Sequence, residues 1–279
     1  MTATLLDGRA LAARLRARLA AEAARVAQER GRAASLALVA VGDDATALLY
    51  GEQVVASCRR VGVSCALSHL PAATSETALR AAIAALGARA DVDGVAILLP
   101  IPRHIRQRVV MEVLAPAKDV DGLGPRNAGH LMLGFPSYVP STAAAALELL
   151  REANVPLQGR DVVVVGRGNA GGKPAALLFL RENATVTICH SRTPDLATIT
   201  RQADILFTSV GRPACVTAAM VKPGAVVLDA GMNATGGRVV GDVAFEEVRA
   251  VAGYLTPVPG GLGPLTNLML IRHTLLGPR

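Results

Sequence analysis

Four consecutive valines at positions 162–165, followed by a glycine-rich turn, constrain the fold more than any other stretch of this 279-residue chain. An uninterrupted β-branched run indicates a strand buried on both faces, as in a parallel sheet covered by helices. The turn matches the pattern G-x-G-x-x-G at Gly166, Gly168 and Gly171, and an apolar helical stretch follows from Pro174. A strand, a glycine turn and a helix in this order are typical of a dinucleotide-binding unit.

The end of the next predicted strand, residues 184–189, indicates which dinucleotide is bound. NAD sites usually have Asp or Glu at this point, whereas this strand runs into His190, Ser191 and Arg192. Arg192, and Arg167 inside the glycine turn, suit a 2′-phosphate through charge-assisted hydrogen bonds. The sequence therefore favours NADP over NAD. An ordinary solvent-exposed loop arginine is the alternative interpretation of Arg192.

The composition narrows the class of protein. The chain is long enough for two domains, and with 51% hydrophobic but only 3% aromatic residues its core must be aliphatic. The formal net charge is +7, yet the basic residues are spread singly, without a long run or interleaved aromatic residues. We therefore expect an anionic small molecule as the partner and no nucleic acid.

The cysteines and the first helix indicate the cellular setting. Cys58, Cys65, Cys189 and Cys215 form no C-x-x-C pair and no metal-like spacing with histidine. We expect reduced thiols, a cytoplasmic protein and no metal site. No apolar run is long enough to cross a membrane. The Arg-rich stretch after Gly8 resembles a transit peptide, but a capping aspartate and a leucine stripe predict the first helix of the mature fold.

Strands alternate with helices along the chain, which predicts an α/β fold built from βαβ units with a parallel sheet. We expect strands at residues 36–41, 63–70, 95–99, 162–165, 184–189, 205–208 and 225–229, and helices at 45–61, 74–90, 105–114 and 142–152. Residues 1–138 and 265–279 are predicted to form one α/β domain, to which the last helix returns. Residues 139–264 are predicted to form a Rossmann-like domain.

Further motifs extend along both halves of the chain. They are Leu6-Asp7-Gly8, Val41-Gly42-Asp43, Asp93-Gly94, Pro100-Ile-Pro102, Lys118-Asp-Val-Asp-Gly122, Cys189-His-Ser191, Asp229-Ala-Gly-Met-Asn233 and the proline–glycine loop Thr256–Pro264. With the glycine turn, they resemble the bifunctional methylenetetrahydrofolate dehydrogenase / methenyltetrahydrofolate cyclohydrolase family nearly end to end. The proline–glycine loop is the most specific of them, because few folds need it.

The resemblance implies an N-terminal folate-binding catalytic domain, a cleft, an NADP-binding Rossmann domain, a homodimer and no metal. It implies that Tyr50 stacks on or orients the pterin and that Asp121 hydrogen-bonds its amino-pyrimidine edge, which makes both candidate catalytic residues. Pro257, Gly260 and Gly261 would wall the folate. The NADP contacts would come from Gly166, Arg167, Gly168, Gly171, Gly172, His190, Ser191, Arg192 and Met232. Outside the family context, Tyr50 is a half-buried helix tyrosine and Asp121 a turn cap.

Two departures from the family pattern concern the reacting centre. The family has Tyr-x-x-x-Lys on the Tyr50 helix and Gln before Leu-Pro, and here those positions hold Val54 and Leu98. Hydride transfer needs aligned reactants. Hydrolysis of the methenyl product also needs a group that activates water and moves protons, which neither side chain can supply. We therefore expect oxidation of methylenetetrahydrofolate with an impaired or lost cyclohydrolase.

Three other interpretations fit the same sequence. The chain could be the full bifunctional enzyme, with Glu52 or an arginine such as Arg59 acting on the water. It could be a non-catalytic paralogue that binds nucleotide or folate or partners a true family member. It could also oxidise a different iminium or carbinolamine substrate in a more apolar cleft.

Overall fold

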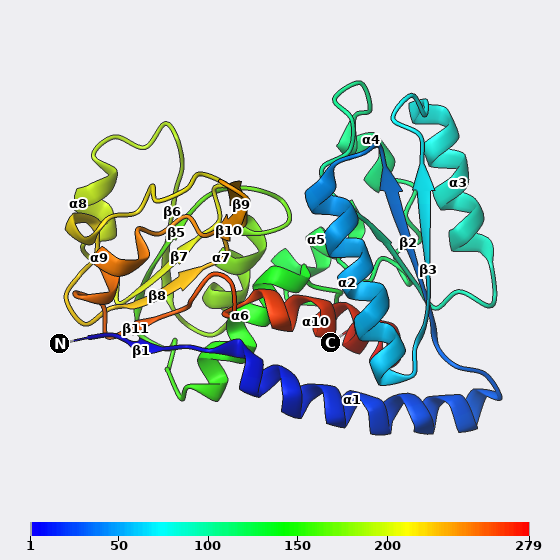
Figure 1. Ribbon diagram of the computed structural model, residues 1–279, viewed down its shortest axis with the longest axis horizontal. Coiled ribbons are helices and arrows are strands. Elements are labelled where there is room, and N and C mark those ends of the chain that lie inside the picture. Colours follow the sequence, from blue (N-terminus) through cyan, green and yellow to red (C-terminus); the bar gives the residue numbers. More distant parts are fainter. Residues whose placement is uncertain (1, 279) are drawn as a thin grey trace. The chain divides into compact units, whose positions relative to one another are not determined.

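The computed structural model describes residues 2–278 and divides into two compact units (Figure 1). The six-stranded unit comprises residues 2–12 and Pro140–Thr266, and the three-stranded unit comprises Ala13–Val139 and residues 267–278. The predicted division at residues 138/139 differs by one residue from the observed one. The first twelve residues differ more, because they belong to the six-stranded unit instead of the N-terminal domain.

The sheet of the six-stranded unit is parallel, with the order β1-β11-β8-β7-β5-β6. Its strands are β1 (Thr4–Leu5), β5 (Asp161–Val165), β6 (Thr185–Cys189), β7 (Ile205–Thr208), β8 (Val226–Asp229) and β11 (Tyr254–Leu255). The four valines of β5 are at most 4% exposed, as the uninterrupted apolar run predicts. Since β6 and β7 pair with opposite edges of β5, the chain reverses its winding there, and such switch points bind ligands beyond the carboxyl ends of the strands.

Short helices and a hairpin complete the six-stranded unit. They are α6 (Ser141–Glu152), α7 (Gly172–Arg181), α8 (Leu196–Thr200), the 3₁₀ turn η1 (Ala218–Met220), α9 (Phe245–Arg249), and β9 (Asn233–Thr235) paired with β10 (Arg238–Val240). The helix predicted at residues 142–152 begins one residue earlier in the structure. Pro140 is the residue before the first turn and Ser141 lies inside the helix, because proline's fixed φ suits that entry.

The three-stranded unit has a parallel sheet in which β2 (Ser35–Val41) lies between β3 (Ser64–Leu70) and β4 (Gly94–Ile97). Figure 1 shows α2 (Ala45–Val61) and α3 (Glu76–Ala88) beside β2 and β3. The Asp44 carboxylate accepts a hydrogen bond from the Ala47 amide, and Gly62 ends the helix with a positive φ of 90°, so both bounds of α2 agree with the prediction.

The remaining helices are α1 (Gly8–Arg30), α4 (Gln107–Met111), α5 (Pro125–Leu133) and α10 (Gly263–Leu276). The predicted helix 105–114 is shorter in the structure, where α4 covers only Gln107–Met111. The sequence did not predict α5, because proline and glycine are typical of loops. None of the helices in the described part of the chain is long and apolar enough to cross a membrane.

Candidate functional site

The glycine turn joins β5 to α7, and each glycine has a different physical role. Gly166 has φ of 123°, and a Cβ there would lie 2.2 Å from the Ser209 carbonyl oxygen. A Cβ on Gly172 would lie 2.0 Å from the Gly166 oxygen, so α7 packs directly on the turn. Gly168, in contrast, has nothing within 4 Å of its Cβ position. The turn is therefore tightly packed toward the protein and open at Gly168, as a cradle for phosphate requires.

The turn after β6 lies next to the glycine turn. The Gly166 amide donates to the Cys189 carbonyl oxygen at 2.8 Å, which extends the β5–β6 ladder to the end of β6. Beyond it, the His190 amide donates to the Thr193 hydroxyl at 2.9 Å, and the Arg192 amide donates to His190 Nδ1 at 3.2 Å. The side chains of Ser191 and Arg192 are exposed there, and that of Arg167 is exposed on the glycine turn. Predicted cofactor contacts from two elements thus share one edge of the sheet.

A buried aspartate, which sequence reasoning missed, fixes the loop after β7. Asp242 is 0% exposed, and its carboxylate accepts backbone N–H groups of Val210 at 2.7 Å, Gly211 at 3.2 Å and Arg212 at 2.9 Å. The same loop presents Ser209 to the glycine turn. Asp242 therefore holds in place one wall of the predicted cofactor site. Its only signal in the sequence was an acidic residue after an apolar run.

Asp229, at the end of β8, supports the same region. Its carboxylate accepts the amides of Gly231 at 2.8 Å and of Asp242 and Val243 at 3.0 Å. A Cβ on Gly231 would lie 2.3 Å from the Asp242 carboxylate carbon, which explains the glycine of the Asp229–Asn233 motif. Burial, with the nearby Asp242 charge, raises the pKa of Asp229 to about 6. Met232, a predicted NADP contact, is 52% exposed beside this cluster.

The raised pKa of Asp229 predicts a pH-dependent stability. Between pH 3.8, the ordinary pKa of an aspartate, and about pH 6, the Asp229 carboxyl keeps its proton in the folded protein and releases it in the unfolded chain. The resulting stabilisation is full below pH ~4 and is lost as the pH rises to ~6. Relative to the non-titrating variant Asp229→Asn, the free energy of unfolding should fall by about 3 kcal/mol over this range. Denaturant titrations of both proteins test this, and a pH-independent difference would contradict it.

The proline–glycine loop is tied to the start of the chain inside the six-stranded unit. The Gly261 amide donates to the Pro257 oxygen at 2.7 Å, and the Gly8 amide donates to the Gly260 oxygen at 2.9 Å. A Cβ on Gly8 would lie 2.0 Å from the Gly261 oxygen. Gly8 of the Leu6-Asp7-Gly8 motif is thus needed to pack this loop. The Asp7 carboxylate also accepts the Arg9 amide at 2.8 Å at the start of α1.

In the three-stranded unit, the residues at the two departures from the family pattern are buried. Val54, on α2, is 0% exposed, and Leu98, just after β4, is 3% exposed. The Leu98 Cδ1 atom lies 2.6 Å from the position that a Cβ on Gly51 would take. Leu98 therefore occupies the space that a side chain at position 51 would fill. Gly51 directly follows Tyr50, which is half-buried. This part of α2 packs as an apolar layer.

Asp119 organises the turn that contains Asp121. It is 1% exposed, and its carboxylate accepts the amides of Leu123 at 3.1 Å and Gly124 at 2.8 Å and the Asn127 side-chain amide at 2.9 Å. Burial raises the pKa of Asp119, while these hydrogen bonds act in the opposite direction. The first aspartate of the motif is therefore structural.

The neighbours of Asp121 are fixed from two sides. His273 Nδ1, on α10, lies 2.7 Å from the Val120 carbonyl oxygen. Gly122 has φ of 61°, and a Cβ there would lie 2.3 Å from the Tyr138 oxygen. Asp121 itself is half-buried. The backbone on both sides of Asp121 is thus held by contacts with distant residues that were not visible in the sequence spacing.

Glu52 and Arg59 lie on another side of α2 from Val54. They are two and five residues from Val54, or about 200° and about 140° around a helix. Both are exposed and line a pocket of about 300 Å³ together with Cys65 and Leu67. The described structure therefore does not bring either side chain to Val54.

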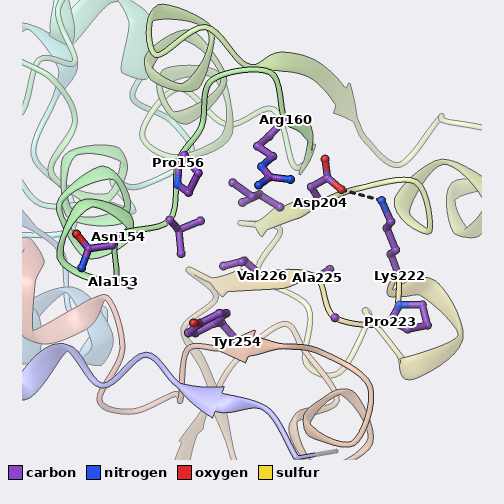
Figure 2. Close-up of a pocket in the computed structure, with 13 residues that line it drawn as sticks. Ala153, Asn154, Pro156, Arg160, Asp204, Lys222, Pro223, Ala225, Val226 and Tyr254 are labelled. Atoms are coloured by element: carbon purple, nitrogen blue, oxygen red, sulfur yellow. Dashed lines mark hydrogen bonds and ion pairs between the residues drawn. The ribbon is translucent and has the colours of Figure 1, made fainter.

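A second cavity, of about 290 Å³, lies in the six-stranded unit (Figure 2). No residue of the glycine turn lines it. It is at the beginnings of β7 and β8, where Lys222 Nζ lies 2.7 Å from the Asp204 carboxylate, with Arg160 and Tyr254 nearby. Ligands of open parallel sheets bind beyond the opposite ends of the strands. This cavity is thus distinct from the predicted cofactor site.

Both units match models of one known protein family. A family model described as tetrahydrofolate dehydrogenase/cyclohydrolase, NAD(P)-binding domain, matches residues 140–277, and the catalytic-domain model of the same family matches residues 6–121. The bifunctional protein FolD of Halalkalibacterium halodurans is 46% identical over 275 residues, which cover 99% of this chain and 98% of the relative.

Two solved structures are similar over the whole fold. The bifunctional FolD enzyme of Campylobacter jejuni has a TM-score of 0.94 and 36% identity, with 98% of each chain covered. The FolD of Trypanosoma brucei, solved with NADP cofactor and inhibitor, also has a TM-score of 0.94 and 36% identity, covering 99% of this chain and 97% of that one.

Proposed function

The chain belongs to the tetrahydrofolate dehydrogenase/cyclohydrolase family, and we propose that it oxidises 5,10-methylenetetrahydrofolate to 5,10-methenyltetrahydrofolate with NADP, its cyclohydrolase impaired or lost. The observation that most supports retained oxidation with impaired hydrolysis is the contrast between the glycine turn and the positions of Val54 and Leu98. The glycine turn keeps its open cradle at Gly168, whereas Val54 and Leu98 are buried apolar side chains and Leu98 packs against Gly51 of the Tyr50 helix.

The residues around the glycine turn fit NADP. The α7 N-terminus and the open backbone at Gly168 suit a pyrophosphate, and Ser191 and Arg192 suit a 2′-phosphate. NADP⁺, when bound, supplies the hydride acceptor. The protein's own contribution is to bind and orient the two reactants, and Asp242 keeps the Val210–Arg212 wall in place for this purpose.

Arg192 is predicted to set the preference for NADP. In the variant Arg192→Ala the Kd for NADP⁺ should rise about 10-fold or more, while the Kd for NAD⁺ changes little, because a charge-assisted pair with the 2′-phosphate is lost. Isothermal titration with both nucleotides measures this selectivity, and Arg160→Ala serves as a control arginine outside the site. An equal loss of affinity for both nucleotides would remove Arg192 from the 2′-phosphate site.

On the folate side, we propose that Asp121 hydrogen-bonds the amino-pyrimidine edge of the pterin and that Tyr50 stacks on or orients it. Asp119 and His273 support the first role, because they fix the backbone on either side of Asp121. Pro257, Gly260 and Gly261 wall the folate in this proposal. The folate nitrogens stabilise the cation that develops during oxidation, so apolar side chains at positions 54 and 98 are compatible with this step.

Hydrolysis has different requirements. A water must lose a proton as it attacks, and a positioned acid or base normally accelerates this ~10²–10⁴-fold. Val54 and Leu98 have no group that exchanges a proton. The positions of Glu52 and Arg59, on another side of α2, disfavour the interpretation that either replaces the missing group.

Reduction of NADP⁺ by the purified protein tests the proposed oxidation. Reduced nicotinamide should form only when methylenetetrahydrofolate is present, and tetrahydrofolate should raise the melting temperature of the protein. If NADP⁺ binds but neither effect occurs, the chain is a non-catalytic paralogue or acts on another iminium or carbinolamine.

We also propose a homodimer built on the six-stranded units. β6 is the last strand of its sheet, and Ile188 and Leu180 near it are 43% and 58% exposed, which suits a self-complementary contact. Light scattering that gives the mass of a single chain at micromolar concentration would contradict this assembly.

A further inference from the structure

Two cysteines of the three-stranded unit face each other across the α2–β3 connection. The amides of Gly62 and Val63 both donate to the Cys58 carbonyl oxygen at 3.0 Å, so the chain reverses directly after the last turn of α2. This reversal brings Cys65 of β3 back to Cys58, and their thiols are hydrogen-bonded to each other. Both are free thiols in this structure.

The two thiols differ in access. Cys58 is 0% exposed, whereas Cys65 is half-buried and lines the pocket of about 300 Å³ next to α2. Arg59 provides a cation at this pocket, and Val55, Ala56 and Leu67 provide apolar walls. A small neutral molecule can therefore reach the sulfur of Cys65, but Cys58 is screened by the protein.

The hydrogen bond also gives the two sulfurs different chemistry. The contact with Cys58 lowers the pKa of Cys65, and the same contact together with burial raises the pKa of Cys58. Of the two thiols, Cys65 is thus the one that loses its proton more readily, and Cys58 is the one that keeps it. Thiolates are the reactive form of cysteine, so the accessible member of the pair is also the nucleophilic one.

From this geometry we infer that Cys58 and Cys65 form a reversible dithiol/disulfide site that reacts with small hydroperoxides entering the pocket at Cys65. This is a modification site separate from the proposed oxidation of folate. The cysteines are seven positions apart in the sequence, on either side of the reversal after α2. Because their thiols are already in hydrogen-bond contact, they need little movement to reach disulfide geometry.

The reaction balances with the hydroperoxide as the oxidant. The Cys65 thiolate attacks one peroxide oxygen, so that an S–O bond forms, the O–O bond breaks and the leaving oxygen takes a proton. The Cys58 sulfur then attacks the Cys65 sulfur, the S–O bond breaks, and the Cys58 proton leaves with that oxygen as water. Two thiols are oxidised to one disulfide while hydrogen peroxide is reduced to two molecules of water.

Peptide mapping of the full-length protein tests the site. Reduced protein is treated with a small excess of hydrogen peroxide, alkylated without reduction and digested with trypsin. Arg59 and Arg60 lie between the two cysteines, so trypsin separates them, and a disulfide appears as two linked peptides. We expect this linkage to be the main product and to disappear with dithiothreitol. Cys215, which is also half-buried but has a raised pKa through burial, should react at least several-fold more slowly.

Variants make the assignment of each sulfur falsifiable. Cys65→Ser should abolish the linkage, Cys58→Ser should leave a sulfenic acid on Cys65 that dimedone traps, and Cys215→Ser should change neither result. The mapping of the natural chain does not depend on whether Cys58→Ser folds. A dithiol that stays reduced while Cys215 is oxidised, or a linkage that persists in Cys65→Ser, would overturn the proposal.

Discussion

The double variant Val54→Lys/Leu98→Gln is expected to hydrolyse methenyltetrahydrofolate about 10²-fold or more faster than the natural chain. The lysine restores a group that can exchange a proton on the Tyr50 helix, and the glutamine restores a polar group after β4. The Leu98→Gln change also removes the Leu98 Cδ1 atom, which now lies where a Cβ on Gly51 would be. Oxidation of methylenetetrahydrofolate should change much less. Decay of methenyl absorbance measures hydrolysis directly.

A matched control separates chemistry from packing in this experiment. The variant Val54→Met/Leu98→Met has flexible side chains in the same layer but no group that exchanges protons, so hydrolysis should stay at the buffer rate. Because Val54 is fully buried, the lysine variant needs a check of folding by its melting temperature and NADP affinity. A folded double variant that binds folate and hydrolyses no faster than the control would show that these side chains are not the missing groups.

The variant Gly172→Ala is expected to lose NADP binding by more than about 100-fold, and the protein should also melt at a lower temperature. The new Cβ would lie 2.0 Å from the Gly166 carbonyl oxygen, a backbone atom that cannot rotate away, so α7 must separate from the turn after β5. Titration with NADP⁺ and a melting curve measure both effects.

Gly168→Ala is the matched comparison in the same turn. A Cβ at Gly168 meets no atom within 4 Å, so the melting temperature without cofactor should stay close to that of the natural protein. The methyl group would point into the space that we assign to the cofactor, and NADP affinity should therefore fall without a loss of stability. If Gly168→Ala binds NADP⁺ normally, the pyrophosphate does not approach the backbone at this glycine.

The sequence was sufficient for elements whose signals are local. The valine run predicts β5, and the helix predicted at residues 45–61 is observed as α2 with the same bounds. The order of elements also predicts two α/β units, and both parallel sheets are present. Local periodicity, caps and turn residues are read directly from neighbouring positions.

Features that depend on distant pairing were not predictable. β1 and β11 contain two residues each, and Thr4 pairs with Tyr254, so neither strand has a periodic pattern and the first residues were assigned to the other domain. The role of Asp242 was missed for the same reason, because its partners are backbone amides about thirty residues earlier. The contact of Cys58 with Cys65 likewise needed the reversal after α2.

One mixing experiment tests the central claim that oxidation persists without hydrolysis. The purified protein is combined with methylenetetrahydrofolate and NADP⁺, and the absorbances of reduced nicotinamide and methenyltetrahydrofolate are followed together. We predict that both rise in equal amounts and that the methenyl signal then decays only at the rate of buffer without enzyme. Reduced nicotinamide that forms while methenyltetrahydrofolate fails to accumulate would contradict this account, because the protein would then be a complete dehydrogenase and cyclohydrolase.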